Sequence, residues 1–74
     1  NMSEMEEYQL NGMRINGIKN TLMACGFQYD DVHKWYLPDG VRLRQDQKDY
    51  FENAKPLFEQ LVKRNNELKK KLGL

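Results

Sequence analysis

The sequence predicts an α+β domain built from an N-terminal helix, one β-hairpin and a long C-terminal helix. Three observations indicate this fold class: a helix-capping signal near the N-terminus, alternation of apolar and polar residues in the middle, and a heptad series in the last third. The 74 residues contain no internal repeat and no linker. We therefore expect residues 1–74 to form a single small domain.

The N-terminal helix is predicted from Ser3-Glu4-Met5-Glu6, which has the S-x-x-E pattern of a capping box. Two Asn-Gly pairs, Asn11-Gly12 and Asn16-Gly17, leave a second interpretation open for residues 4–15, because Asn-Gly also favours a tight hairpin turn. We favour the helix, which we expect Gly26 to end in a left-handed conformation. Several side chains then share one helical stripe: Tyr8, Ile15, Ile18, Leu22 and Cys25.

The hairpin is predicted from two alternating segments, 32–37 and 41–44, that flank a turn at 37–40. In this turn Pro38 presets φ and Gly40 accepts a positive φ. The resulting register pairs Leu37 with Val41, Tyr36 with Arg42, Trp35 with Leu43, and Lys34 with Arg44. One face then carries His33, Trp35, Leu37, Val41 and Leu43, and the opposite face carries Lys34, Tyr36, Arg42 and Arg44.

The C-terminal helix is predicted over about residues 46–72 from an apolar heptad series: Phe51, Ala54, Phe58, Leu61, Asn65, Leu68 and Leu72. Pro56 allows two interpretations. Either the main helix starts near Asn53, with Pro56 in its first turn, or a longer helix kinks at Pro56. A helix over residues 46–72 is ~40 Å long, so we expect its end to protrude and to need a partner.

We predict that the heptad positions of this helix, which form its apolar seam, are used for self-association. Its residues before Leu61 suit packing on the chain's own domain, whereas the later ones suit a second helix. The predicted homodimer interface consists of Phe58, Leu61, Asn65, Leu68 and Leu72. Asn65 at an a position favours a parallel pair, but the basic flanking residues Arg64, Lys69 and Lys71 favour an antiparallel pair or an acidic partner helix. The polarity of the dimer stays open.

Charge is distributed unevenly along the chain. Residues 1–40 hold three basic and six acidic side chains, and residues 41–74 hold nine basic and five acidic ones, within a net charge of +1. The hairpin face of Lys34, Tyr36, Arg42 and Arg44 is the candidate nucleic-acid-binding surface, because cations can contact phosphates while Tyr36 stacks on a base. The alternative is a solvated sheet face with a Tyr36–Arg42 cation–π pair.

Catalytic, metal and membrane sites are not expected. A lone His33 and a lone Cys25 cannot supply the four ligands of a structural zinc site, and His33 beside Asp30 and Asp31 has no nucleophile near it in sequence. We therefore predict no catalytic residue, no metal and no cofactor. No apolar run approaches the ~20 residues of a membrane span, so a cytoplasmic protein with no membrane partner is expected.

The segment from Ile18 to Val41 resembles the central part of the HicA-type mRNA interferases. It shares a helix ending in Gly26-Phe27, a histidine-containing strand and a Pro38-Asp39-Gly40 turn, over about a third of the chain. In that family Gly-Ser-His precedes the strand. Here Asp31-Val32 stands where the serine and the catalytic histidine would fall, with His33 one place later. The resemblance therefore implies a degenerate relative without nuclease activity.

Our functional hypothesis is a small non-enzymatic accessory or regulatory protein, of a phage or other mobile element, that forms a homodimer and contacts nucleic acid through its basic hairpin face. The alternative is a protein–protein adaptor or inhibitor whose basic helix docks on an acidic partner helix. A degenerate mRNA-interferase-like protein is the third interpretation. The first two differ in salt dependence, because nucleic-acid affinity should fall steeply with salt across many sequences.

Overall fold

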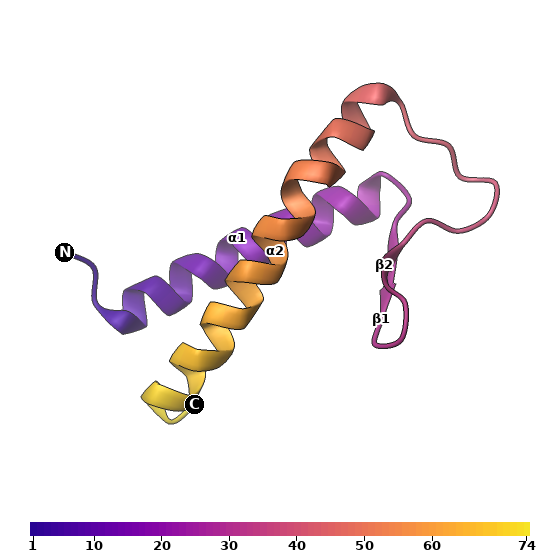
Figure 1. Ribbon diagram of the computed structural model, residues 1–74. Helices are drawn as coiled ribbons and strands as arrows, with labels where there is room; N and C mark the ends of the chain where they lie inside the picture. Colours follow the sequence, from indigo (N-terminus) through magenta and orange to yellow (C-terminus); the bar gives the residue numbers. More distant parts are fainter.

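The computed structural model describes residues 1–74 and contains α1 (Glu4–Ala24), β1 (Gln28–Asp30), β2 (Lys34–Tyr36) and α2 (Gln45–Leu72). The predicted α+β fold is confirmed. Figure 1 shows the two long helices crossing, with the small hairpin beside the C-terminal end of α1 and the N- and C-termini at the opposite end of the helix pair.

Helix α1 begins at the predicted capping box. The Ser3 hydroxyl accepts a hydrogen bond from the Glu6 N–H, and the Glu6 carboxylate accepts one from the Ser3 N–H, both at 3.1 Å. The helix runs through both Asn-Gly pairs, so the hairpin interpretation of residues 4–15 is wrong. Gly26 ends it at φ 105°, as predicted, and the Phe27 N–H bonds the Leu22 carbonyl at 3.1 Å.

The hairpin is real, but its predicted register is wrong. Strand β1 pairs antiparallel with β2, so that Gln28 faces Tyr36, Tyr29 faces Trp35 and Asp30 faces Lys34. Residues 41–44 form no strand. The turn after Pro38 exists, closed by a 3.2 Å hydrogen bond from the Val41 N–H to the Pro38 carbonyl, but it leads into an extended loop to α2.

Asp30 explains why the chain reverses earlier than predicted. Its Oδ1 atom accepts hydrogen bonds from the backbone N–H groups of Val32, at 2.9 Å, and of His33, which folds residues 31–33 into a turn. An aspartate that bonds the backbone two and three residues on is a local turn former. The reversal brings Tyr29 against Trp35, with ring centroids 5.0 Å apart.

Helix α2 is the longer of the two helices that the sequence allowed. It runs from Gln45 to Leu72 with Pro56 inside it. The Gln47 Oε1 atom accepts a 2.9 Å hydrogen bond from the Arg44 N–H and so satisfies one donor at the helix start. Pro56 is exposed, so water can reach the carbonyl that its missing N–H leaves without a helical partner.

The core is small and joins all three parts of the fold. Seven hydrophobic side chains are buried: Ile18, Leu22, Phe27, Trp35, Ala54, Leu61 and Leu68. Leu68 is fully buried although it lies near the end of α2. The end of α2 therefore does not protrude, because α1 starts at Glu4 and its 21 residues extend ~30 Å alongside it. Neither helix combines the length and apolarity needed to cross a bilayer.

Candidate functional site

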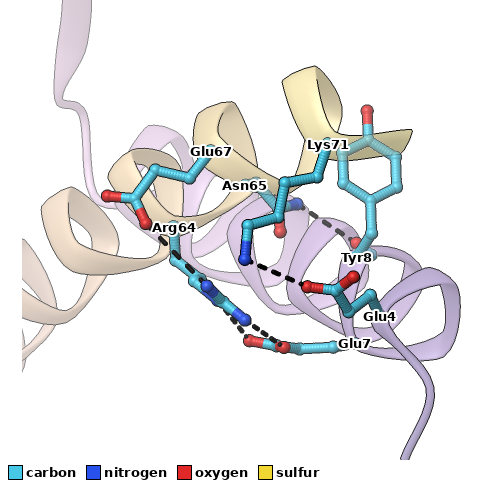
Figure 2. Close-up of polar contacts among 7 residues, drawn as sticks. All are labelled: Glu4, Glu7, Tyr8, Arg64, Asn65, Glu67 and Lys71. Carbon is cyan, nitrogen blue, oxygen red and sulfur yellow. Dashed lines mark hydrogen bonds and ion pairs between the residues drawn. The ribbon is translucent and has the colours of Figure 1, made fainter. Parts of the chain in front are cut away.

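Ion pairs join the N-terminal end of α1 to the C-terminal part of α2 (Figure 2). The Nε and Nη2 atoms of Arg64 donate to the two carboxylate oxygens of Glu7 at 2.8 and 2.9 Å, and Lys71 Nζ lies 3.3 Å from Glu4 Oε2. The hydrogen bonds from Arg64 lower the pKa of the Glu7 carboxyl. These contacts align the two helices antiparallel.

Asn65 lies in the same contact, beside the ion pairs (Figure 2). Its Nδ2 atom donates to the Tyr8 carbonyl at 3.1 Å, while its Oδ1 atom is buried with no hydrogen-bond partner. The asparagine therefore bonds the backbone of α1 in the same chain. This differs from the predicted pairing with its counterpart in a second copy.

The five predicted dimer-interface residues lie largely against this chain's own elements. Leu61 and Leu68 are buried, Phe58 packs against the core beside Trp35, and Asn65 and Leu72 are half-buried. The cations expected to repel a second copy, Arg64 and Lys71, are paired with carboxylates of α1. Helix α1 thus occupies the place that the heptad pattern assigned to a partner, and the homodimer stays a prediction.

The four predicted nucleic-acid-binding residues do not share a sheet face. Lys34 and Tyr36 lie on β2, but Arg42 and Arg44 lie in the loop before α2, because the register that grouped them is wrong. Arg44 Nε lies 3.0 Å from an oxygen of Asp46. The Tyr36 hydroxyl donates to Gln28 Oε1 at 2.9 Å. Lys34 and Arg42 form no ion pair within the chain.

A pocket of about 340 Å³ opens between the hairpin and α2. Aromatic rings form much of its wall: Trp35 packs edge-to-face against Tyr29 and Phe58, with centroids 5.0 and 5.4 Å away. Tyr29 is 46% exposed, whereas Trp35 is 6% exposed, so the wall is accessible on one side only. We call it the hairpin–α2 pocket; it is lined by Tyr29, Lys34, Trp35, Phe58, Glu59, Val62, Lys63 and Asn66.

Lys34, at the pocket, has an unusual backbone. Its φ of 60° is the only positive φ of a non-glycine residue in the chain. The left-handed region costs an L-residue roughly 1–2 kcal/mol, and such outliers cluster at ligand sites. The preceding turn, held by Asp30, imposes this conformation where strand β2 begins. The strained backbone and the pocket thus coincide at one lysine.

The charges of the hairpin–α2 pocket leave a positive excess. Lys34, Lys63 and Glu59 are its three charged lining residues, which gives a net charge of +1. Neither lysine has a carboxylate oxygen within 4.0 Å. By contrast, Arg44, Arg64 and Lys71 are each paired. The two lysines therefore keep their charges available to an anionic ligand.

Most residues that line this pocket were not predicted from the sequence. Tyr29, Glu59, Val62 and Asn66 were not predicted to line a site, and Lys63 was noted only as part of the basic charge of the C-terminal helix. A weak signal was present, because Phe58 and Val62 are four residues apart and extend the apolar seam toward one side of α2. That signal does not reveal which element covers this side, since the covering residue Tyr29 belongs to a strand that the predicted register left out.

His33 belongs to the turn between β1 and β2. Its Nδ1 atom lies 2.8 Å from Asp30 Oδ2, and the two side chains are 64% and 42% exposed. The His33 backbone N–H, followed by its ring, lowers the pKa of the Asp30 carboxyl. Cys25 lies at the C-terminal end of α1, where it is half-buried. The Asp30–His33 pair therefore closes the turn between β1 and β2.

Comparisons of the chain with known protein families, curated proteins and solved structures found no match. The fold and the pocket define an α+β chain with one partly enclosed aromatic site and two free lysines at it. Its function is therefore inferred from this geometry alone.

Proposed function

We propose that this chain is a non-enzymatic interaction protein whose hairpin–α2 pocket binds an acidic peptide segment. One apolar side chain of the peptide enters between Tyr29, Phe58 and Val62, and flanking carboxylates meet Lys34 and Lys63. The observation that carries the proposal is an aromatic pocket with two lysines that have no internal partner. This is the adaptor alternative, with the pocket in place of the seam that α1 covers.

The size of the pocket suits a single side chain. Its volume of about 340 Å³ is at the small end of ligand pockets, which begin near ~300 Å³. Burying one large apolar side chain contributes roughly 1.5–3 kcal/mol, and each exposed ion pair up to ~1 kcal/mol. With two ion pairs these contributions total at most about 5 kcal/mol, so a peptide with one anchor is expected to bind with a Kd of roughly 0.2 mM or weaker.

The distribution of cations favours a peptide over nucleic acid. A polyanion gains affinity when many phosphates are contacted together, on the order of 6–10 in a strong complex. Of the twelve Lys and Arg side chains, Arg44, Arg64 and Lys71 are already paired with carboxylates, and the other nine are divided among α1, β2, the loop before α2 and α2. The pocket lysines can recognise two or three carboxylates, which is enough for a short acidic peptide.

The test is a titration followed by the fluorescence of Trp35, the only tryptophan in the chain. Three 12-residue peptides are compared: one with a central Phe flanked by Asp and Glu, one with that Phe replaced by Ala, and one with Lys replacing the acids. A 15-nucleotide oligothymidylate is the fourth ligand. We expect saturable binding of the first peptide only.

Two charge-reversed variants complete this test. Lys34→Glu with Lys63→Glu should abolish binding, whereas Lys48→Glu with Lys55→Glu, two exposed lysines outside the pocket, should retain most of it. The two variants have the same net charge, so a general charge effect would weaken both equally. Equal weakening, or preference for the oligonucleotide, would refute the peptide proposal.

A further inference from the structure

The outer face of α1 has no partner within the chain. Six exposed positions, five on α1 and Met2 just before it, follow one another at spacings of seven, four, three, four and three residues. None of the six is charged, Glu6 is the one acidic residue beside them at the N-terminal part, and Met13 is 72% exposed. A hollow of about 320 Å³ lies at its N-terminal part, lined by Met2, Glu6, Gln9, Leu10 and Met13. We call these six positions the outer α1 face: Met2, Gln9, Met13, Asn16, Asn20 and Met23.

The exposed face of α2 is different. Outside the hairpin–α2 pocket it carries charges of both signs over its whole length, including Lys48, Glu52, Lys55, Glu67 and Lys70. A helix face of this kind is hydrated and needs no cover. Depletion of charge together with exposed methionine is instead the composition found in the centre of protein interfaces. The comparison singles out α1 as the helix that has a second face to bury.

The chain exposes more surface than a compact monomer of its size. Its accessible surface is 5598 Å², whereas a folded monomer of 8.9 kDa exposes about 4800 Å². Its radius of gyration is 14.1 Å, against about 11 Å for 74 compact residues. This excess of about 800 Å² belongs to the whole elongated chain, and it is similar in size to the area that one partner buries in a standard interface.

The presence of two glycines in α1 is also not explained by contacts within the chain. Gly12 and Gly17 lie in the helix interior, where each costs ~1 kcal/mol relative to alanine. A Cβ atom at either position would meet no atom within 4 Å, so the chain's own packing does not require glycine there. Gly17 follows Met13 by one helical turn. A second helix could approach the backbone of α1 closely beside Met13.

We infer that a second copy of this chain covers the outer α1 face, with the two α1 helices antiparallel and the twofold axis near Met13. The face is then self-complementary, as a twofold interface requires. Antiparallel packing brings Glu6 to the level of Lys19 of the other copy, whereas the other two acidic side chains of the first turn, Glu4 and Glu7, already pair with Lys71 and Arg64 of α2. Parallel packing would place the acidic turns together. The interface is separate from the hairpin–α2 pocket and does not depend on peptide binding.

Sedimentation equilibrium of the full chain tests the inference. We expect a dimer mass for the wild type at tens of micromolar, and a dissociation constant raised about a hundredfold or more by Met13→Glu, because two carboxylates then meet at the axis. Val32→Glu is the matched control, since Val32 is 85% exposed in the turn between β1 and β2. It should remain dimeric. A monomeric wild type at several hundred micromolar overturns the inference.

A cross-link tests the orientation and does not depend on the folding of Met13→Glu. In a Cys25→Ala background, Met13→Cys should form a disulfide-linked dimer under mild oxidation, because a residue on a twofold axis meets itself. Leu57→Cys, on α2 and 37% exposed, should stay monomeric on denaturing gels. Equal cross-linking of the two variants, or dimers unaffected by Met13→Glu, would contradict the proposed interface.

Discussion

Replacing Asn65 by leucine is expected to stabilise the chain. Its buried Oδ1 atom has no hydrogen-bond partner, and a buried unsatisfied acceptor costs about 1–3 kcal/mol. The substitution also removes the Nδ2 bond to the Tyr8 carbonyl, worth about 0.5–1.5 kcal/mol. That carbonyl lies inside α1 and keeps its helical bond, so nothing becomes newly unsatisfied. We expect the free energy of unfolding to rise by about 1–2 kcal/mol.

Urea unfolding followed by Trp35 fluorescence measures this change, because Trp35 is buried and unique in the chain. Asn66→Leu is the matched control: it makes the same residue change one position later, at an exposed site, and so gives the same gain in helix propensity. Its unfolding free energy should shift by about 0.5 kcal/mol or less. An unfolding free energy of Asn65→Leu no higher than that of Asn66→Leu would refute the reasoning.

Three further predictions follow from the packing of α1 on α2 and from the turn. Leu68→Ala should lower the free energy of unfolding by about 3 kcal/mol in urea titrations, because Leu68 is fully buried in a small core. Glu7 has a lowered pKa, so its stabilising contribution is complete above the ordinary carboxyl pKa of 4.5 and is lost as the pH falls through the folded-state value. Thermal melts from pH 7 to 2 should therefore show a smaller acid loss for Glu7→Gln than for wild type, with Glu52→Gln behaving as wild type. Lys34→Gly should raise the unfolding free energy by about 1 kcal/mol, because it relieves the left-handed backbone, while weakening peptide binding.

The ends of the helices could be predicted from the sequence because their signals are local. Ser3 and Glu6 satisfy each other within one turn, and Gly26 supplies a conformation that its neighbours cannot adopt at low cost. The heptad positions of α2 were also predictable, since Leu61 and Leu68 must be buried by some element. These features do not depend on the rest of the fold.

The pairing partners could not be predicted in the same way. The turn at Gly40 and the turn at Asp30 both form, and the packing of Tyr29 on Trp35 and Phe58 accompanies the pairing of β2 with residues 28–30 instead of 41–44. Likewise, a heptad stripe fits a second copy or a helix of the same chain equally well. The length of α1, which two Asn-Gly pairs obscured, decides that it is α1. The pocket could not be predicted for the same two reasons, because its walls come from the hairpin and from α2.

The most direct test of the proposed function is an unbiased selection of ligands for the hairpin–α2 pocket. Wild-type chain and the Lys34→Glu, Lys63→Glu variant are immobilised separately and each is exposed to a random 12-residue peptide library. We predict that wild type enriches peptides with one large apolar residue flanked by Asp and Glu, and that the variant loses this preference. Enrichment of the same peptides by both proteins, or no enrichment by wild type over an empty support, would contradict the account.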